Sequence, residues 1–95
     1  MHEEKHAAIK QYLAEKFLGC EIKQKHDFAR RSQSFKLHIV DFTLLLKVGD
    51  EFVDDNSTPE IIRLFNLWGL AEVLGNEKEF GVLVSQHGLD SFRRC

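Results

Sequence analysis

The first stretch of the chain repeats its apolar residues at helical spacing. Ile9, Leu13 and Phe17 lie four residues apart and fall on one stripe. A repeat close to 3.6 residues predicts an amphipathic helix over residues 3–18. Gly19 follows this stripe, and glycine is the residue that most often ends a helix in the left-handed conformation.

Beyond this helix the apolar pattern changes to a period of two, which is typical of β-strands with one buried face. Residues 20–28 and 35–39 alternate in this way, and the polar segment 30–33 between them predicts a hairpin. Residues 43–48 are more uniformly apolar, as in a central strand that is covered on both faces. Residues 51–53 are expected to form a short further strand, or to continue the third one past a bulge.

A polar segment ahead of Pro59 marks the start of a second helix. Pro59 suits the first helical position with Thr58 as the N-cap, and Ser57 with Glu60 fits a capping box one residue earlier. This helix is expected to run to about Leu74, and it is apolar around almost its whole circumference.

The C-terminal part of the chain contains one more strand pattern. Residues 80–84 alternate and predict a last strand, whereas residues 89–95 are expected to form a polar C-terminal tail. A helix between two strands predicts a right-handed crossover, which places the last strand parallel to a neighbour.

These elements predict a single domain over residues 1–95, because the length is close to the commonest domain size. The expected fold is a two-layer α+β domain in the order α-β-β-β-α-β, with a mainly antiparallel sheet and helices packed on one face. Ten apolar side chains are expected to be buried together. They are Ile9, Leu13, Phe17, Leu37, Ile39, Leu44, Leu46, Phe65, Trp68 and Val82.

The composition of the chain bears on the cellular compartment in which the protein is expected. No apolar run approaches the roughly 18 residues that a membrane span needs, and the N-terminal residues are charged with mixed sign, unlike a signal peptide. Cys20 and Cys95 do not have the spacing of a metal or redox motif. We therefore expect a reducing, cytoplasmic setting and no membrane partner.

Charge is distributed unevenly along the chain. Residues 16–38 carry six basic and two acidic side chains, a net charge of +4, whereas residues 39–80 carry nine acidic and three basic ones, a net charge of −6. Opposite poles of this kind can steer a charged partner or favour self-association, or they can lie close together on a mixed surface.

The basic residues of the predicted hairpin define the candidate binding site. They are Lys23, Lys25, Arg30, Arg31, Lys36 and His38. Strand alternation puts the lysines and the histidine on the polar face, with the arginines at the turn. Such a ribbon could bind nucleic-acid phosphates or an acidic protein, or it could be a solvated face whose lysines protect a sheet edge. No exposed aromatic side chain is expected on this face, so base stacking is not indicated.

The second predicted helix carries a candidate interface. One domain of this size can cover only part of a helix that is apolar all round. Leu67, Leu70 and Leu74 are therefore expected to remain exposed for a homodimer or another partner. The alternative is that the first helix and the C-terminal tail cover these leucines.

Motifs for catalysis and metal binding are weak. The chain has neither a Gly-x-Ser-x-Gly elbow nor a glycine-rich phosphate loop. Its acidic segment 50–55 lacks the spacing of a calcium loop and fits a solvated helix cap. His2 and His6 lie four residues apart without a third ligand at motif spacing. We expect no catalytic residue, no metal and no cofactor.

The order of elements resembles the core of the restriction-endonuclease-like nucleases, in topology only, over residues 3–85. That family carries an acid in the first helix, an acid near the second strand, and an acid-x-Lys in the third. Glu15 and Asp41 match the first two positions, but Leu45 stands where the resemblance requires a metal-binding acid before Lys47. Without this carboxylate, the resemblance implies a binding-only relative rather than an active nuclease.

The first five elements also resemble double-stranded-RNA-binding domains, which carry a basic cluster at the start of the second helix. Here Asp54, Asp55 and Glu60 give that position the opposite charge. We therefore hypothesise a non-catalytic, self-associating interaction module that docks a protein or a nucleic acid through the basic hairpin. The alternative is a metal-dependent nucleic-acid enzyme with an atypical site, or a degenerate nuclease-like core.

Overall fold

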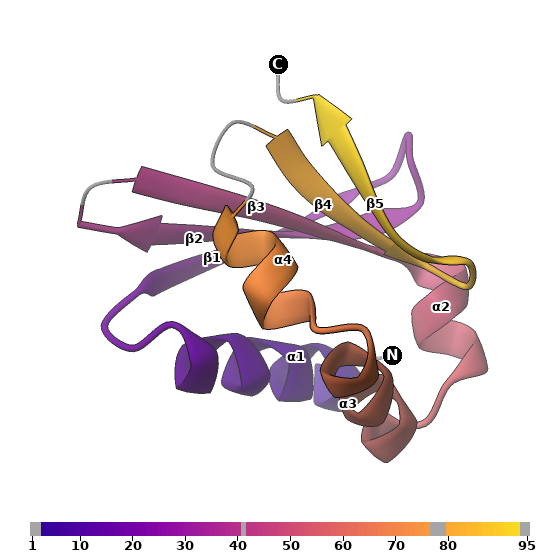
Figure 1. The fold of residues 1–95 in the computed structure, drawn as a ribbon. Helices are drawn as coiled ribbons and strands as arrows, with labels where there is room; N and C mark the ends of the chain where they lie inside the picture. The colour runs from indigo at the N-terminus through magenta and orange to yellow at the C-terminus, as the bar shows by residue number, and fades with distance from the viewer. Residues whose placement is uncertain (1–2, 41, 77–79, 94–95) are drawn as a thin grey trace.

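The computed structural model describes residues 3–40, 42–76 and 80–93, which form a five-stranded sheet with four helices beside it (Figure 1). The elements in chain order are α1 (Glu3–Lys16), β1 (Glu21–Asp27), β2 (Ser32–Ile39), β3 (Phe42–Gly49), α2 (Asp50–Asp55), α3 (Thr58–Leu67), α4 (Leu70–Asn76), β4 (Phe80–Ser85) and β5 (Gly88–Arg93). The strands are ordered β1-β2-β3-β4-β5 across the sheet. Neighbouring strands are antiparallel except β3 and β4, which are parallel, as the helical connection between them predicted.

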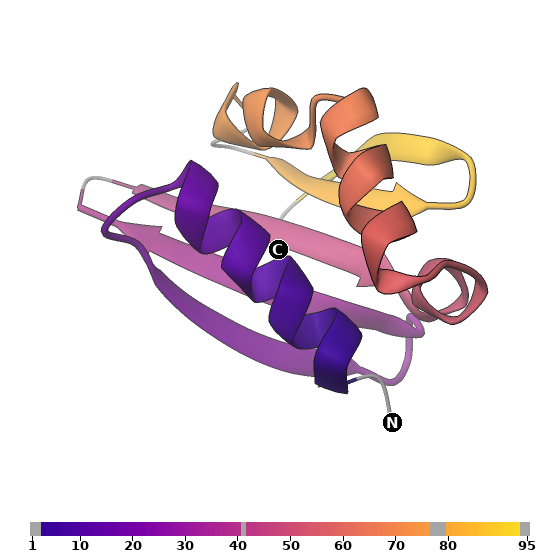
Figure 2. The same ribbon diagram turned by 90° about the horizontal axis from the view of Figure 1, so that it is seen from below.

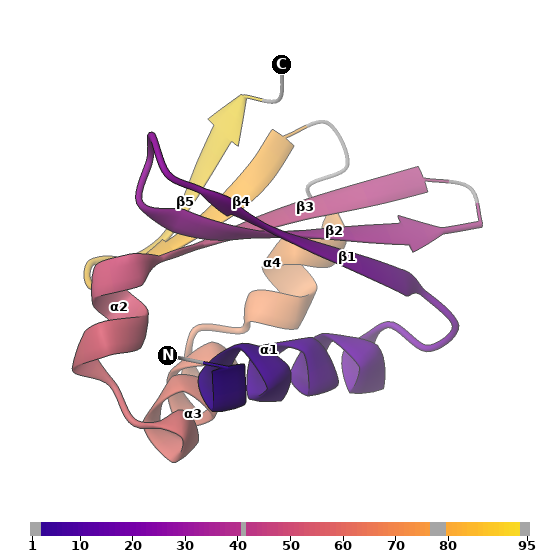
Figure 3. The same cartoon turned by 180° about the vertical axis from the view of Figure 1, so that it is seen from behind.

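The helices form one layer against a single face of the sheet, as expected. Figure 2 looks at that face and shows α1 crossing the N-terminal strands, with α3 and α4 beside it. The same layering is visible from behind in Figure 3, where the sheet lies above the helices. Over the described residues, none of these helices is long and apolar enough to cross a membrane.

The core fills the space between the two layers, because the apolar faces of the strands and helices turn toward each other. Its buried hydrophobic side chains are Ile9, Tyr12, Leu13, Phe35, Leu37, Leu44, Leu46, Val48, Phe52, Val53, Ile61, Phe65, Leu70, Leu74, Val82 and Val84. Seven of the ten expected core residues belong to this set. The other three, Phe17, Ile39 and Trp68, are partly buried and pack against it.

Residues 51–53 do not form a strand. They lie in α2, where Phe52 and Val53 are adjacent in sequence and both buried. A strand points adjacent side chains to opposite faces, whereas a short helix can turn two neighbours toward one core. The side chain of Asn56, which follows α2, donates a hydrogen bond to the Phe52 carbonyl oxygen at 2.8 Å. The prediction of a further strand here was therefore wrong.

The second predicted helix is divided into α3 and α4. Ser57 is the N-cap of α3, as in the capping-box alternative, and its hydroxyl accepts a hydrogen bond from the Glu60 backbone N–H. Gly69 has a φ of +65°, a left-handed conformation that a right-handed helix cannot continue through. One continuous helix to Leu74 was the wrong prediction, because a single glycine in an apolar pattern does not reveal such a turn.

Residues 88–93 form β5 and not a polar tail. Gly88, with a φ of +111°, turns the chain from β4 into β5, which then pairs antiparallel with β4. The two apolar side chains of β5 lie on opposite faces, since Leu89 packs against the core and Phe92 lies on the other side. So few apolar residues give only a weak alternation. Positions 94 and 95 of the predicted tail lie outside the described residues.

Candidate functional site

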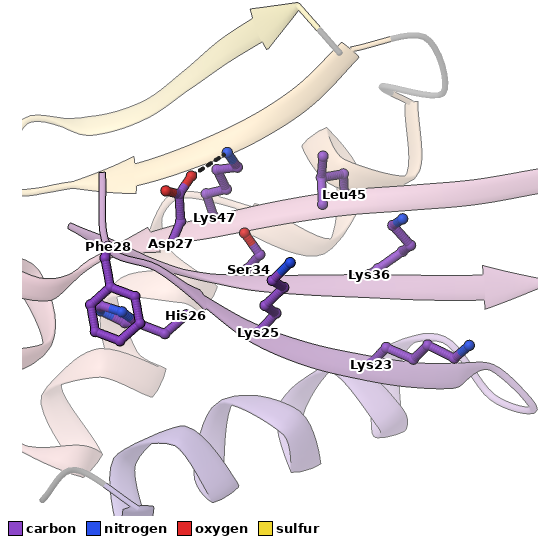
Figure 4. A pocket seen from close by; sticks show the side chains of 9 residues that line it. All are labelled: Lys23, Lys25, His26, Asp27, Phe28, Ser34, Lys36, Leu45 and Lys47. Atoms are coloured by element: carbon purple, nitrogen blue, oxygen red, sulfur yellow. Dashed lines mark hydrogen bonds and ion pairs between the residues drawn. The ribbon is translucent and has the colours of Figure 1, made fainter. Parts of the chain in front are cut away.

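Four lysines lie on the sheet face opposite the helices, which we call the open face. Lys23 of β1 lies opposite Lys36 of β2, and Lys25 lies opposite Ser34, whose partner on β3 is Lys47. Directly opposed residues of a sheet point to the same face, so the four ammonium groups share one side. Figure 4 shows these side chains on three neighbouring strands. The sequence predicted three of the four as one group.

Two adjoining hollows occupy the open face. The first, of about 580 Å³, lies among the four lysines and is also lined by Asp27, Phe28 and Leu45 (Figure 4). The second, of about 470 Å³, is lined by Arg30, Phe92 and Arg93 together with Asp27, Leu45 and Lys47. Because they share these last three residues, the hollows meet there. We call the two together the open-face groove.

An ion pair lies where the two hollows meet. The Lys47 ammonium donates a hydrogen bond to Asp27 Oδ2 at 3.1 Å, and both side chains are partly buried. Asp27 Oδ1 accepts a second hydrogen bond, from the Arg30 backbone N–H at 3.2 Å, which holds the start of the β1–β2 turn. The hydrogen bond from Lys47 holds the pKa of the Asp27 carboxyl below its usual range. The Asp27 carboxyl is therefore ionised at neutral pH.

We expect this pair to stabilise the fold only where Asp27 is ionised. The pKa of Asp27 is lower in the folded chain, so its contribution is present above about pH 4 and is lost as pH falls through the folded-state pKa. Asp27→Asn keeps an acceptor for the Arg30 N–H. It should lower the free energy of unfolding at about pH 7 and have much less effect at about pH 2. Urea denaturation of both proteins measures this, and an equal loss at both pH values would contradict it.

Two aromatic rings border the open-face groove. Phe92 lies opposite Gly81, and a β-carbon added at position 81 would come within 2.1 Å of the ring's Cζ. The Lys47 ammonium lies 5.2 Å from the centroid of this ring. Phe28 lines the first hollow, is 84% exposed, and lies edge-on to His26 with ring centroids 4.3 Å apart. The expectation that this face lacks aromatic side chains was therefore wrong.

The other predicted hairpin residues are Arg30, Arg31 and His38. Arg30 lines the second hollow of the groove. It also lines a third hollow, of about 310 Å³, together with Arg31, Asp50 and Glu51, so the basic and acidic poles of the chain meet there. His38 lies further along β2 and lines neither hollow of the groove. The predicted site residues that the structure brings together in the groove are Lys23, Lys25, Arg30 and Lys36.

Several lining residues of the groove were not among the predicted site residues, including Asp27, Phe28, Lys47, Phe92 and Arg93. The sequence did contain a signal for Lys47. A strand covered on both faces rarely carries a lysine, so this residue indicated that one face of the third strand is open. β3 is in fact covered by helices on one face only, and Lys47 alternates with the buried Leu46 and Val48. Phe92 and Arg93 could not be placed without β5.

The structure contradicts part of the prediction that three leucines of the second helix are exposed. Leu70 and Leu74 are fully buried in α4, which contacts β3 and β4. The turn at Gly69 is the reason, because it lets α4 leave the direction of α3 and lie against the sheet. Only Leu67 remains exposed, at 67%. Two of the three predicted interface residues therefore belong to the core.

Of the two acids that match the nuclease resemblance, the structure describes Glu15, which does not lie on the sheet face of Lys47. Asp27 approaches Lys47 and is already ion-paired with it. Glu15 is exposed on α1, in the helix layer, and Asp41 lies outside the described residues. Within the part of the chain that the structure describes, no group of three His, Cys, Asp or Glu side chains could hold a metal ion.

The acidic segment, the cysteines and the histidines were the other chemical candidates from the sequence. The acidic segment forms α2, where Asp50 Oδ2 lies 2.8 Å from His26 Nε2. Burial raises the pKa of the Cys20 thiol, which is the opposite of the change that activates a nucleophilic cysteine. His2 and Cys95 lie outside the described residues.

Comparisons with known proteins add no family to this description. No protein-family model matches the chain. No match was found among curated proteins or among solved structures.

Proposed function

We propose that the protein is a non-catalytic binding module whose open-face groove holds the sugar–phosphate backbone of a nucleic acid. The observation that carries this proposal is the set of four lysines on three neighbouring strands, on the face opposite the helices. Ammonium groups supply affinity for phosphates largely without reading base sequence. The proposal selects one of the two partner classes that the sequence allowed.

The spacing of the lysines suits a polymer with regularly repeated charges. Neighbouring strands lie about 4.8 Å apart, and alternate residues along a strand lie about 6.8 Å apart. Lys23, Lys25 and Lys36 are exposed, so their long side chains can extend toward successive phosphates. Lys47 is partly buried and ion-paired with Asp27, so among the described residues the three exposed lysines supply the unpaired positive charge of the set.

The composition of the groove favours a nucleic acid over an acidic protein. Lysine is depleted at the centres of protein–protein interfaces, whereas protein–nucleic acid interfaces are strongly positive. Arg30 and Arg93 extend the positive charge into the second hollow. Of the acids on this face, Asp27 is paired with a lysine, and Glu21 and Asp90 lie on the edge strands β1 and β5.

Reversal of two lysine charges tests the proposal. We expect Lys25→Glu combined with Lys36→Glu to weaken binding of a fluorescein-labelled oligonucleotide of about 16 nucleotides, a length at the upper end of small-domain site sizes. Fluorescence anisotropy at several salt concentrations measures the affinity. The slope of log K against log salt should fall by at least about 1.4, because each phosphate contact contributes about 0.7–0.9. Stability should hardly change, since exposed charges contribute little to it.

Two lysines of α1 provide the matched control. Lys10→Glu combined with Lys16→Glu makes the same change in net charge on the helix side of the sheet, and it should keep nearly wild-type binding. Equal losses in both double variants would show that net charge, and not the open face, governs binding. If the wild type binds polyglutamate and no oligonucleotide, the partner is an acidic protein and the proposal is wrong.

A metal-dependent nucleic-acid enzyme was the alternative from the sequence. Such an enzyme needs carboxylates that hold a divalent cation, and the Asp27 carboxylate at Lys47 is engaged in an ion pair. Incubation of a labelled strand with the protein and Mg²⁺ separates the two functions. An intact strand supports the binding module, whereas cleavage that disappears in Asp27→Asn would support the enzyme.

A further inference from the structure

We infer that the bound nucleic acid is single-stranded and that Phe92 stacks against one of its bases in the second hollow. This inference rests on the proposed function, because it adds a base contact to the phosphate contacts of the lysines. Three observations carry it: the position of the Phe92 ring over Gly81, the cations around the same hollow, and the exposed Phe28 ring in the first hollow.

The Phe92 ring rests on the backbone of β4. A β-carbon at Gly81 would lie 2.1 Å from Cζ and 2.6 Å from both Cε atoms, so the tip of the ring lies over this residue rather than beside it. A glycine inside a strand is typical of such a close approach. The sheet therefore supports the ring from below, and Phe92 lines the second hollow. A supported ring loses little conformational entropy when a base stacks on it.

Three basic side chains and the Asp27 carboxylate line the second hollow together with this ring. The Lys47 ammonium lies 5.2 Å from the ring centroid. Arg30 and Arg93 line the same hollow, from the β1–β2 turn and from the end of β5. A base on Phe92 would thus have basic side chains beside it on β3, on β5 and at the turn.

Phe28 offers a second ring in the neighbouring hollow. It is 84% exposed, which is unusual for a phenylalanine, and it leans edge-on against His26. His26 is itself held by Asp50, with Nε2 and Oδ2 2.8 Å apart. Each hollow thus has an aromatic ring and basic side chains in its lining, and this is the combination by which proteins bind single strands with little sequence preference.

A duplex does not fit this arrangement as well as a single strand does. Its bases are stacked on each other and paired, so their faces cannot reach Phe92 without unstacking, which costs a few kcal/mol in base-flipping enzymes. A single strand can turn its bases outward toward aromatic side chains while its phosphates remain near the lysines.

Three probes of equal length test the inference on the wild-type protein: an oligothymidylate strand, an abasic strand with the same phosphates, and a duplex. We expect the oligothymidylate to bind at least about fivefold tighter than the abasic strand, since one stacked base contributes a factor of about 5–150. Binding by phosphates alone predicts equal affinity for the two strands and tighter binding of the duplex, whose charge density is higher.

Two substitutions then assign the effect to residues. Phe92→Leu keeps an apolar side chain over Gly81 and should remove most of the preference for oligothymidylate, while binding of the abasic strand is retained. Phe28→Leu changes an exposed ring and should reduce the same preference without affecting the fold. Circular dichroism checks folding of both variants. If Phe92→Leu is unfolded, the comparison of the three probes on the wild type still tests whether a base stacks and whether a single strand is preferred.

The outcomes separate this inference from the proposed function. Equal affinity of the wild type for oligothymidylate and the abasic strand overturns the stacking inference and leaves phosphate binding standing. A preference for oligothymidylate that survives in Phe92→Leu overturns the assignment to Phe92. Abasic-strand binding that is unaffected by Lys25→Glu with Lys36→Glu overturns the proposed function itself.

Discussion

Leu70→Glu is expected to unfold the protein or to leave it barely stable. Leu70 has no exposed surface and belongs to the core that α4 forms with β3 and β4. Truncation of a buried leucine to alanine costs about 2–5 kcal/mol, and glutamate adds the cost of burying an unpaired carboxyl group. A domain of this kind has a total stability of about 5–15 kcal/mol. Urea denaturation followed by circular dichroism measures the loss.

Leu67→Glu is the matched control for this prediction. Leu67 is 67% exposed at the end of α3, so the same chemical change should alter the free energy of unfolding by no more than about 0.5 kcal/mol. Self-association through the second helix was expected from the sequence, and of the three predicted interface leucines only Leu67 is exposed. A folded, monomeric Leu70→Glu protein, beside a dimeric wild type in light scattering, would contradict the burial of Leu70.

Phe65→Ala is expected to cost about 3–5 kcal/mol. Its ring is fully buried where α1, α2 and α3 meet. The ring centroid lies 5.2 Å from that of Tyr12 and 6.1 Å from that of Phe52, whose ring is nearly parallel to it. One kcal/mol shifts the melting temperature of a domain of this size by about 4–8 °C, so Tm should fall by at least about 12 °C. Calorimetry of both proteins measures the difference.

Phe28→Ala provides the comparison with an exposed ring. It removes the same atoms from a side chain that is 84% exposed, so its melting temperature should stay within a few degrees of the wild type. A similar fall in both variants would mean that Phe65 does not fill the core as the structure places it.

The sequence by itself determined those features that depend on local burial patterns. The apolar stripe of Ile9 and Leu13 predicted α1, because side chains four residues apart share a helix face whatever the rest of the fold does. Alternation placed Lys23, Lys25 and Lys36 on one side of the hairpin for the equivalent reason. A parallel pairing of the strand after the helical connection with one of its neighbours also followed, since such a connection returns the chain in the same direction, and the structure identifies that neighbour as β3.

Only the tertiary structure decided which apolar side chains are covered and which distant residues meet. Leu67 and Leu70 are the same residue type in one apolar segment, and the left-handed turn at Gly69 separates an exposed position from a core position. β5 has a weak pattern of its own and is a strand because the edge of β4 offers partners for its backbone hydrogen bonds. That pairing brings Phe92 beside Lys47, and the ion pair with Asp27 joins β1 to the same place. The open-face groove is made of such long-range contacts, and a local pattern of polar and apolar residues does not encode them.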